Sequence, residues 1–499
     1  MHVRILSEQL RAFEILSHDR NPLHNDPIYS RSTQFGQPIV YGMCGVLLGL
    51  GHWARDRAFR LTRIRGRFAQ PLFESVEYEL KIQEEGNQTK IQYLRGGMTQ
   101  IGFVFAWEES EAATGAAPTK PESSFEPFTV AKDVDLEGAV ARWQGVEYPY
   151  SIRYESLSQL LPRLCLQPAQ IPINQLNALM GSSFLVGMEI PGRQALYSDF
   201  EFEFEAIPPG EGSVPFQFRN VSAELDARFN RVSVSGRGSG IRSFSLSAHQ
   251  RPYRVRYGVD DIQRAVCNSK AFKNKVAFIS GATRGFGAVL AKFFAMQDAD
   301  VFVNYRSRRD EAEAIANELR PWNTRVFPIA GDVSKTEDCR QIRAEIENRF
   351  GRIDLLVSNA FPHISVRGFM DQTTGEFLRF LETSIATTVT LLRELLPLVP
   401  QGGIVMLIST RYTLEPKAQF SHYVASKSCL EALMRSLALE FPDQKFVIAR
   451  PPRMLTDQTN LAFDLSPPVS AVAVARELIE AIGQLDSASN LVEFDLGKN

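Results

Sequence analysis

The sequence lacks paired cysteines, a long hydrophobic run and an excess of charge of either sign. Its five cysteines stand singly along the chain: Cys44, Cys165, Cys267, Cys339 and Cys429. Without a C-x-x-C pair, this pattern indicates neither a zinc site nor a disulfide framework, and we expect no bound metal. The apolar stretch at residues 42–54 is too short to span a bilayer. A formal net charge of −2 gives no electrostatic reason to expect nucleic acid or an anionic membrane as a partner.

Residues 1–4 (MHVR) carry no apolar signal core, so we expect a soluble, cytoplasmic protein with reduced cysteines. The hydrophobic fraction of 44% and the charged fraction of 22% are typical of a globular protein. A chain of 499 residues is too long for one hydrophobic core, and roughly two to four domains are expected.

The first half of the chain has a helix-then-strands pattern that occurs twice. A helix at residues 42–55 precedes strand-like runs at 64–69, 75–83, 90–95 and 103–107. A second helix at 175–186 precedes strand-like runs at 195–206, 214–221 and 244–247. Residues 108–126, which are poor in large aliphatic side chains, are predicted to form a flexible linker between the two sets.

Residues 200–205 read FEFEFE, the strict alternation of a strand with one buried and one solvated face. A long helix followed by an antiparallel sheet, twice over, is typical of an α+β double hot-dog fold. We place its halves at residues 1–108 and 127–254.

From residue 275 onward, strands and helices alternate. Short apolar runs at 276–280, 301–305, 326–329, 355–357, 404–408 and 446–449 are each followed by a helical stretch. This alternation predicts an α/β Rossmann-type domain with a doubly wound parallel sheet at residues 274–499. Residues 255–274 are then the connection between the two parts.

Two motifs in the α/β region carry chemistry. Residues 280–287 (SGATRGFG) follow a strand and open a helix, where glycines let the backbone approach a pyrophosphate. Residues 423–427 (YVASK) place a tyrosine one helical turn before a lysine. Together with Asp332-Val333 and Ser358-Asn359-Ala360, they resemble the short-chain dehydrogenase/reductases of the β-ketoacyl reductase type.

The resemblance implies a role for each matching residue. Tyr423 would protonate the nascent alkoxide, and Lys427 would hold the nicotinamide ribose and lower the tyrosine pKa. Thr410 stands where the family has a carbonyl-binding serine, with Ser409 as the alternative. The cofactor-binding residues implied are Gly281, Thr283, Arg284, Gly285, Phe286, Gly287, Arg306, Asp332, Val333, Asn359, Ala360, Tyr423, Lys427 and Thr456.

Three positions depart from that family. Ser384 stands in place of its usual asparagine, which puts the efficiency of the proton relay in question. Phe361 and Pro452 each stand in place of a glycine. One alternative is therefore that this half only binds a nucleotide or an acyl chain.

The choice of cofactor follows from the arginines. Arg284 lies in the glycine loop. The second strand of the α/β region ends near Arg306 and not at an acidic residue, which would bind a ribose 2′-hydroxyl. Arginines suit a 2′-phosphate, so we expect NADPH. The alternative is that Arg306, like Arg308 and Arg309, belongs to the basic start of a helix.

A second motif lies near the N-terminus. Residues 17–24 (SHDRNPLH) and their continuation through Gly42-Met43 resemble the MaoC-like, R-specific enoyl hydratases. Moving H and OH across a C=C bond beside a thioester needs an acid and a base, which Asp19 and His24 would supply. The N–H of Gly42 would polarise the thioester oxygen with help from a helix dipole, and Asn21 would fix the loop.

Two residues depart from the hydratase pattern: His18 replaces a glycine, and Tyr41 replaces a histidine. The first is expected to strain or reshape the loop, and the second to alter the pocket wall. Residues 137–253 contain no Asp/His signature, and His249 and His422 are interpreted as structural or surface residues. An alternating set of arginines (Arg63, Arg65 and Arg67) fits a solvated strand face or, less well, a phosphopantetheine or carrier-protein contact.

Together the motifs predict a bifunctional ketoreductase/dehydratase that converts a 3-oxoacyl thioester through the (3R)-hydroxyacyl to the trans-2-enoyl thioester. By resemblance, the substrate would be carried on an acyl carrier protein or CoA, and the enzyme would be a homodimer or homotetramer. The first alternative is the oxidative direction, with hydration of an enoyl-CoA and oxidation by NAD. The second is that one half is a non-catalytic binding module. The sequence leaves the acyl chain open.

Overall fold

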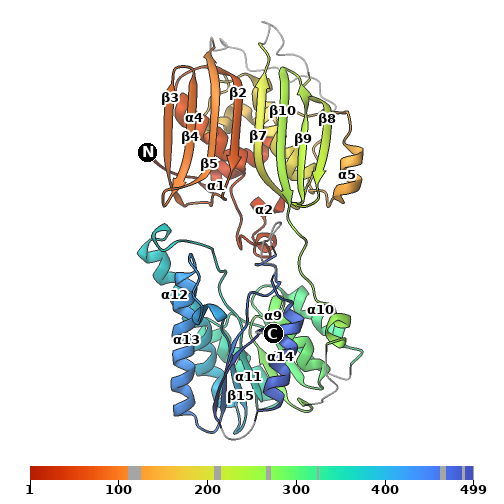
Figure 1. The fold of residues 1–499 in the computed structure, drawn as a ribbon, viewed down its shortest axis with the longest axis vertical. Coiled ribbons are helices and arrows are strands. Elements are labelled where there is room, and N and C mark those ends of the chain that lie inside the picture. Colours follow the sequence, from red (N-terminus) through yellow and green to blue (C-terminus); the bar gives the residue numbers. More distant parts are fainter. Residues whose placement is uncertain are drawn as a thin grey trace. The chain divides into compact units, whose positions relative to one another are not determined.

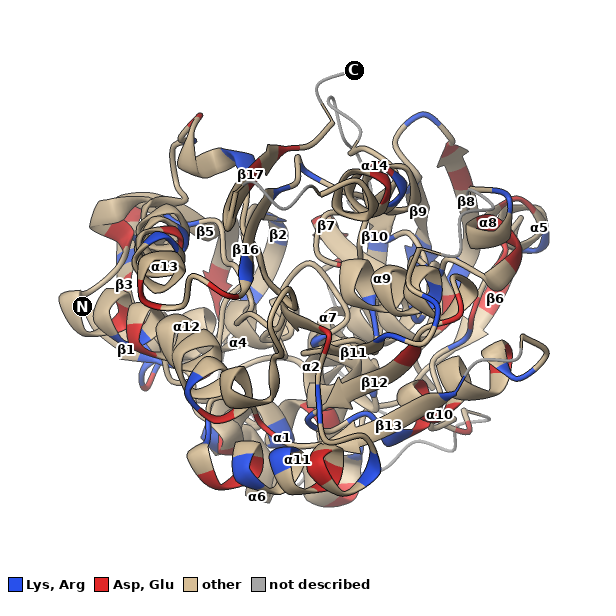
Figure 2. Cartoon of the chain, turned by 90° about the horizontal axis from the view of Figure 1, so that it is seen from below, with Lys and Arg blue, Asp and Glu red and all other residues tan. Residues whose placement is uncertain are grey.

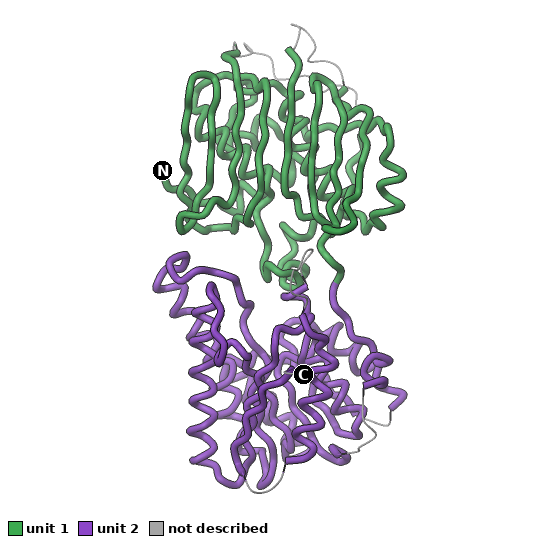
Figure 3. Tube along the Cα trace, in the orientation of Figure 1, with its two compact units in different colours: residues 1–253, 461–464 green, residues 254–460, 465–499 purple. Residues whose placement is uncertain are grey.

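A computed structural model describes residues 1–110, 125–206, 215–265, 271–322, 325–460, 468–485 and 489–497. The chain forms two compact units that divide between Tyr253 and Arg254 (Figure 3). Most of the linker predicted at 108–126 lies outside the described residues. Basic and acidic residues are interspersed in both units (Figure 2). Within the described ranges, no helix has the length and apolar character needed to cross a membrane.

Unit 1 is built on one antiparallel sheet, which has ten strands within the described residues (Figure 1). In spatial order they are β1 (His2–Arg4), β3 (Glu77–Glu85), β4 (Gln88–Arg95), β5 (Met98–Glu109), β2 (Phe59–Phe68), β7 (Ala195–Phe204), β10 (Ile241–Gln250), β9 (Arg231–Gly238), β8 (Gln217–Asp226) and β6 (Val146–Pro149). Both halves of unit 1 therefore contribute strands to a single sheet, and the two sets are joined where β2 pairs with β7.

Two central helices of unit 1 contact one another: α4 (Gly42–Ala54), from the first half, and α7 (Ile173–Phe184), from the second. Nearly all residues of both are buried, because each is apolar or small on every side. In β7 the side chains of Phe200, Phe202 and Phe204 are buried and the glutamates between them are not, which confirms the predicted alternation. These helices and the inner face of the sheet share one hydrophobic core.

Three strands of unit 1 do not appear among the predicted ones. β1 and β6 are only three and four residues long. β9 carries two buried valines, Val232 and Val234, among serines, arginines and glycines, so it offers no apolar run to detect. The predicted strand at 214–221 corresponds to β8, which begins at Gln217 and continues to Asp226.

Unit 2 has a parallel sheet of seven strands within its described residues. Their order is β13 (Val326–Ala330), β12 (Asp300–Tyr305), β11 (Val276–Ile279), β14 (Leu355–Ser358), β15 (Ile404–Ile408), β16 (Lys445–Arg450) and β17 (Leu491–Asp495). The order reverses between β11 and β14, and side chains beyond the carboxyl ends of these strands therefore border a crevice suited to a nucleotide. β17 was not predicted, because its short run LVEFD mixes apolar and acidic residues.

Helices cover both faces of this sheet. One apolar cluster joins the sheet to α9 (Gly285–Met296), α10 (Arg309–Leu319) and α14 (Ala471–Gly483). The other joins it to α11 (Thr336–Arg349), α12 (Thr374–Leu395) and α13 (Ser421–Glu440). The predicted connection at 255–274 contains a further helix, α8 (Val259–Gln263), because Ile262 is fully buried in the first of these clusters.

Candidate active sites

The N-terminal motif runs from the end of α1 (Ser7–Ser17) through a short loop of unit 1 into α2 (Pro22–Asn25), so Asp19 lies on the loop and His24 on α2. His18 ends α1 in the left-handed conformation, with φ of 58° and ψ of 7°. Left-handed backbone favours glycine, which explains why the resembling family has glycine at this position. Here the turn is kept with a histidine, so the loop is strained locally without losing its path.

Asp19 is the buried carboxylate of this loop. Its Oδ2 accepts a hydrogen bond of 2.7 Å from Ser183 Oγ, and its Oδ1 accepts one of 3.1 Å from the Asn21 N–H. Gly187 makes room for the carboxylate, since a Cβ there would lie 2.8 Å from Asp19 Oδ1. Burial raises the pKa of Asp19 to about 7, against the opposing effect of the two hydrogen bonds.

Ser183 belongs to α7, so the second half of unit 1 supplies a direct contact to the acid of the first. This contact could not be predicted from the sequence, because a single serine in an apolar helix has no recognisable pattern. Asn21 makes hydrogen bonds within the loop and to the second half of unit 1. Its Oδ1 caps the Leu23 N–H at 3.0 Å, and its Nδ2 donates to the carbonyls of Gly187 at 2.7 Å and Gly192 at 3.0 Å.

His24 is held by a backbone carbonyl and by an aromatic ring. Its Nδ1 lies 2.8 Å from the carbonyl oxygen of Ile39. A carbonyl only accepts, so Nδ1 carries the proton and Nε2 keeps a free lone pair. Burial lowers the pKa of His24 to about 4. The Tyr41 ring stacks on the imidazole at 4.0 Å, and its hydroxyl donates to the Asp19 carbonyl at 3.0 Å. Tyr41, which departs from the family pattern, therefore contacts both His24 and Asp19.

Asp19, Asn21, His24 and Gly42 all line one cavity of about 380 Å³. Ser183 and Gly187 reach it from the second half of unit 1. Gly42 begins α4, whose N-cap Tyr41 makes no side-chain cap, so the first-turn N–H groups are donors that the helix itself cannot satisfy. The arrangement can hold a neutral base, a carboxylic acid and a carbonyl-binding helix end around one small molecule.

His249 and the arginines of β2 also lie in unit 1. His249 was predicted to be structural or at the surface, but it lines the same cavity. The alternating arginines of β2 face acidic residues of β7: Arg63 forms an ion pair with Glu201, and Arg67 bonds Asp199 at 2.7 Å. These pairs favour the interpretation of a solvated strand face.

The glycine loop of unit 2 connects β11 to α9. Gly281 has φ of 63°, and a Cβ on Gly287 would lie 2.5 Å from Asn359 Nδ2, so the loop, the helix and the residue after β14 are packed closely. Asn359 Nδ2 donates to the carbonyls of Ser280 at 3.0 Å and Gly281 at 3.1 Å. α9 begins at Gly285 without a side-chain cap, which leaves N–H donors for an anionic group. The donor set fits the pyrophosphate of a dinucleotide.

The other predicted cofactor residues lie around this loop. Thr456 approaches Gly285, with its Cγ2 3.6 Å from where a Cβ would be. Asp332 accepts from the Ser334 hydroxyl at 2.7 Å, while the Val333 side chain is buried in the core. The Phe286 side chain is buried as well, so Phe286 and Val333 can offer a cofactor little besides backbone.

The two arginines expected to read a 2′-phosphate have different partners. Arg306 lies 3.6 Å from Asp332 and is 58% exposed. Arg284 is largely buried, and burial together with the charge of Arg308 lowers its pKa. The carboxylates of Asp457 and Glu311 act in the opposite direction. Both cations and carboxylates therefore act on the Arg284 guanidinium.

Tyr423 and Lys427 lie one turn apart on α13, both buried. The Thr410 hydroxyl hydrogen-bonds the Tyr423 phenol, whose pKa is raised to about 12 mainly by burial. Lys427 Nζ donates to the Ile408 carbonyl at 2.6 Å, and burial lowers its pKa to about 7. The structure therefore places three of the predicted residues around the carboxyl end of β15.

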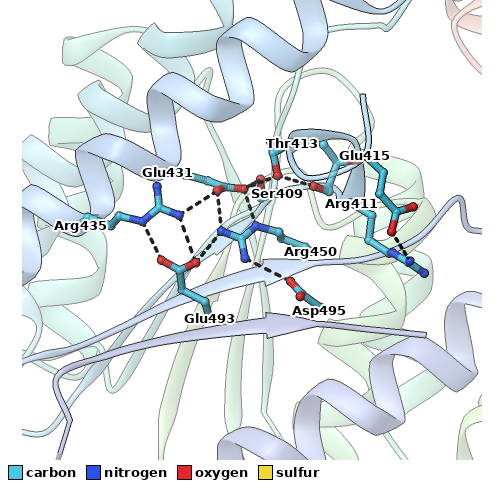
Figure 4. A network of polar contacts seen from close by, with 10 residues as sticks. Ser409, Arg411, Thr413, Glu415, Glu431, Arg435, Arg450, Glu493 and Asp495 are labelled. Atoms are coloured by element: carbon cyan, nitrogen blue, oxygen red, sulfur yellow. Dashed lines mark hydrogen bonds and ion pairs between the residues drawn. The ribbon is translucent and has the colours of Figure 1, made fainter. Parts of the chain in front are cut away.

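Ser409, the alternative to Thr410, is engaged elsewhere (Figure 4). Its hydroxyl donates to Glu431 Oε1 at 2.5 Å, and the same oxygen accepts from Thr413 at 2.9 Å. Arg450 binds both oxygens of Glu431, at 2.9 and 2.6 Å, and joins it to Glu493 at 2.6 Å. This buried network holds the residues on either side of Thr410, and Thr410 remains the hydroxyl that contacts Tyr423.

Phe361 and Ser384 are two of the residues that depart from the reductase pattern. Lys427 Nζ lies 4.0 Å from the centroid of the Phe361 ring, and Phe361 also contacts Tyr423 edge-on at 5.4 Å. Ser384 is buried in α12 and donates to the Phe380 carbonyl at 2.6 Å. Where the family has an amide for a relay, this chain has a hydroxyl turned onto its own helix. His422 is buried against Phe380, which suits a structural role.

Two family models match the chain. Residues 1–100 match the MaoC like domain, and residues 275–486 match short chain dehydrogenase. These are the two regions that carry the motifs.

Individual relatives align with the C-terminal region. Versicolorin reductase 1 of Aspergillus parasiticus is 29% identical over 175 residues, which are 35% of this chain and 66% of that protein. L-fucose dehydrogenase of Oryctolagus cuniculus is 32% identical over 34% of this chain and 58% of its own. A 3-oxoacyl-[acyl-carrier-protein] reductase of Staphylococcus epidermidis is 26% identical over 38% of this chain and 80% of its own. The chain thus spans less than two thirds of the first two proteins.

Among solved structures, a short chain dehydrogenase from Burkholderia cenocepacia J2315 in complex with NADP is 21% identical. The match covers 45% of this chain and 98% of the Burkholderia chain, with a TM-score of 0.41. An alcohol dehydrogenase from Thermococcus sibiricus complexed with 5-hydroxy-NADP is 25% identical, covering 44% and 95%, also with a TM-score of 0.41.

Proposed function

Because this chain carries an N-terminal MaoC-like domain and a C-terminal short-chain dehydrogenase domain, we propose that it is a bifunctional ketoreductase/dehydratase. Its substrate is a 3-oxoacyl thioester, reduced to the (3R)-hydroxyacyl and then dehydrated to the trans-2-enoyl thioester. One observation carries the proposal: two separate buried sets of acid, base and carbonyl-binding groups occur in one polypeptide, and the product of one suits the other.

In the dehydration step, His24 Nε2 takes the proton from Cα, because its Nδ1 is already committed to the Ile39 carbonyl. Asp19, whose pKa is about 7, delivers a proton to the departing hydroxyl. The free N–H groups at the start of α4, from Gly42 onward, stabilise the enolate oxygen of the thioester. The two halves of unit 1 then form a double hot-dog fold, in which Ser183 from the second half completes the site of the first.

In the reduction step, a nicotinamide cofactor held by these residues would supply a hydride to the 3-oxo carbon. Thr410 and Tyr423 bind the carbonyl oxygen, and Tyr423 gives it a proton as the alkoxide forms. Lys427 holds the ribose of the cofactor, and its charge stabilises the tyrosinate that remains. The uncapped start of α9 binds the pyrophosphate.

The cofactor is NADPH in this proposal. Arg284 and Arg306 border the end of the glycine loop and of β12, where an acidic side chain would otherwise select a 2′-hydroxyl. A 2′-phosphate would place negative charge beside Arg284 and so oppose the effect of burial and of Arg308, which lower the pKa of this guanidinium.

The carrier of the acyl group is an acyl carrier protein or CoA. One similar reductase is named for an acyl-carrier-protein substrate, which supports the first choice. Biosynthesis of a fatty-acid or polyketide type follows from this direction of chemistry.

The test is to supply purified protein with NADPH and a 3-oxobutyryl thioester, following absorbance of the cofactor and product masses. Reduction followed by loss of about 18 Da identifies both activities in sequence. Use of NADH at equal or better efficiency would overturn the cofactor assignment and favour the oxidative direction. Accumulation of the hydroxyacyl product by the unaltered protein would reduce unit 1 to a binding domain.

A further inference from the structure

Residues 254–258, here called the strap, begin unit 2 and line a cavity together with residues 283–285 of the glycine loop. Tyr257 is the centre of the strap. Its hydroxyl donates to the Leu455 carbonyl at 3.0 Å and accepts from the Ala471 N–H at 3.3 Å. Its own carbonyl accepts from Lys292 Nζ at 2.8 Å. One tyrosine thus joins the loop after β16, the start of α14 and the middle of α9.

The strap has two further attachments. The Val255 N–H donates to Asp457 Oδ1 at 3.0 Å, and Arg254 Nη1 binds Glu311 Oε1 at 2.9 Å. Asp457 and Glu311 are the two carboxylates whose charges act on Arg284. The attachments therefore converge on the surroundings of the glycine loop from two sides.

The loop that the strap holds is residues 453–460, called here the cofactor loop. It is shaped by its own hydrogen bonds, since the Asn460 N–H donates to the Thr456 carbonyl at 2.9 Å and the Thr456 N–H donates to Thr459 Oγ1 at 3.0 Å. These bonds fix the form of the turn. Tyr257 and Val255 fix where that turn lies, because they bind Leu455 and Asp457, and Lys292 of α9 in turn binds the Tyr257 carbonyl.

The position of this loop matters because Thr456 meets the glycine loop. Its Cγ2 lies 3.6 Å from the Cβ position of Gly285, the residue that opens α9. The strap, residues 283–285 and Asp457 enclose a cavity of about 130 Å³. A displacement of the cofactor loop would therefore change the space beside the donors that receive the pyrophosphate.

We propose that Tyr257 is a positioning residue for the nicotinamide cofactor, and that the connection between the two catalytic regions is a working part of the reductase. The strap holds the cofactor loop in its binding position before the cofactor arrives, so binding does not have to order it. This inference rests on the proposed reductase function. It adds to that function a residue outside the region that matches short chain dehydrogenase, residues 275–486.

The test uses Tyr257→Phe in the full-length chain, with the dissociation constant of NADPH measured by fluorescence. Loss of two hydrogen bonds should raise that constant about 5- to 20-fold. The kcat at saturating NADPH should change less than about twofold, since Tyr423 and Lys427 keep their partners. Tyr253→Phe is the matched control: Tyr253 lies four residues earlier in unit 1, with its hydroxyl 3.5 Å from the Val134 carbonyl. It should leave NADPH binding unchanged.

Hydrogen exchange of the same variants without cofactor provides an independent readout. Tyr257→Phe should speed amide exchange in residues 453–460, and Tyr253→Phe should not. Unchanged exchange there, or a loss confined to kcat, overturns the inference. If the unaltered protein binds no NADPH, the reductase proposal fails by itself, and exchange in the cofactor loop still shows whether the strap positions it.

Discussion

The two candidate sites are assembled in opposite ways, yet burial acts on both alike. In unit 1 the acid and the base come from one short segment of the chain, with Asp19 on a loop and His24 on α2; in unit 2 the groups come from the end of β15 and from α13. Burial raises the pKa of Asp19 to about 7 and lowers that of His24 to about 4. It likewise raises the pKa of Tyr423 to about 12 and lowers that of Lys427 to about 7. In each site the uncharged forms are favoured.

That shared effect has different consequences for the two reactions. Dehydration needs a protonated acid and an unprotonated base, which are the forms that burial favours in Asp19 and His24. Reduction needs a protonated tyrosine, which burial also favours, but a charged lysine, which it does not. The reductase site therefore depends on what surrounds Lys427, including the Glu431 carboxylate, which raises its pKa.

The largest effect should come from Tyr423→Phe. Removing the phenol removes the proton donor, and the rate of 3-oxoacyl reduction should fall by about 10³-fold or more. Dehydration of a supplied (3R)-hydroxyacyl thioester should continue at the original rate, because that site lies on other residues. Loss of both activities would contradict two independent sites.

Asp19→Asn should separate the sites in the other direction. The amide keeps the shape but cannot deliver a proton, so dehydration should fall by about 10²-fold or more, while NADPH oxidation with a 3-oxoacyl thioester continues. Mass spectrometry should then find the hydroxyacyl product accumulating. The matched control is Asp26→Asn, since Asp26 is a half-buried N-cap residue in the same region and asparagine can also cap a helix. A similar loss in the control would mean that loop disruption, not proton transfer, is measured.

The pH dependence should distinguish the sites further. The kcat/KM of dehydration should rise as His24 loses its proton near pH 4 and fall as Asp19 loses its proton near pH 7. The kcat/KM of reduction should fall above about pH 7, as Lys427 loses its charge. Each falling limb approaches tenfold per pH unit, and initial rates across pH 5 to 9 (roughly the working range of such assays) measure it. Dehydration that increases above pH 8 would contradict Asp19 as the acid.

The features that could be predicted from the sequence are those encoded by a few neighbouring residues. The glycine loop and the Tyr423–Lys427 pair are short motifs in a strand–helix context, and both family assignments made from such motifs are confirmed by the family models. The parallel sheet of unit 2 was predicted because its central strands are continuous apolar runs. The catalytic roles remain predictions.

Long-range contacts account for what could not be predicted. Ser183 is separated from Asp19 by 164 positions, and nothing in its own helix marks it. Ser409 belongs to a buried network with Glu431 and Arg450. These three side chains come from separate parts of the chain, so the network could not be predicted. The strap reads as a plain connection in the sequence, because Tyr257 acquires its partners only in the folded unit.

The smallest predicted effect tests how far the second half of unit 1 takes part in catalysis. Ser183→Ala removes the hydroxyl that donates to Asp19 Oδ2, and Ser182→Ala removes a neighbouring hydroxyl that donates to the Leu179 carbonyl of its own helix. Both variants delete one oxygen from the same buried helix, so they differ chiefly in the contact to Asp19. Dehydration should fall about tenfold in Ser183→Ala, in line with the loss of one buried hydrogen bond that holds the acid, and little in Ser182→Ala.

The pH profile decides whether that loss arises at Asp19. The Ser183 hydrogen bond lowers the pKa of Asp19 by stabilising the carboxylate. Without it the pKa rises, and the falling limb of the dehydration profile should move to higher pH in Ser183→Ala while it stays in place in Ser182→Ala. A lower rate with an unmoved limb would mean that the serine supports packing alone. A moved limb would show that a helix without a motif of its own tunes the acid of the other half.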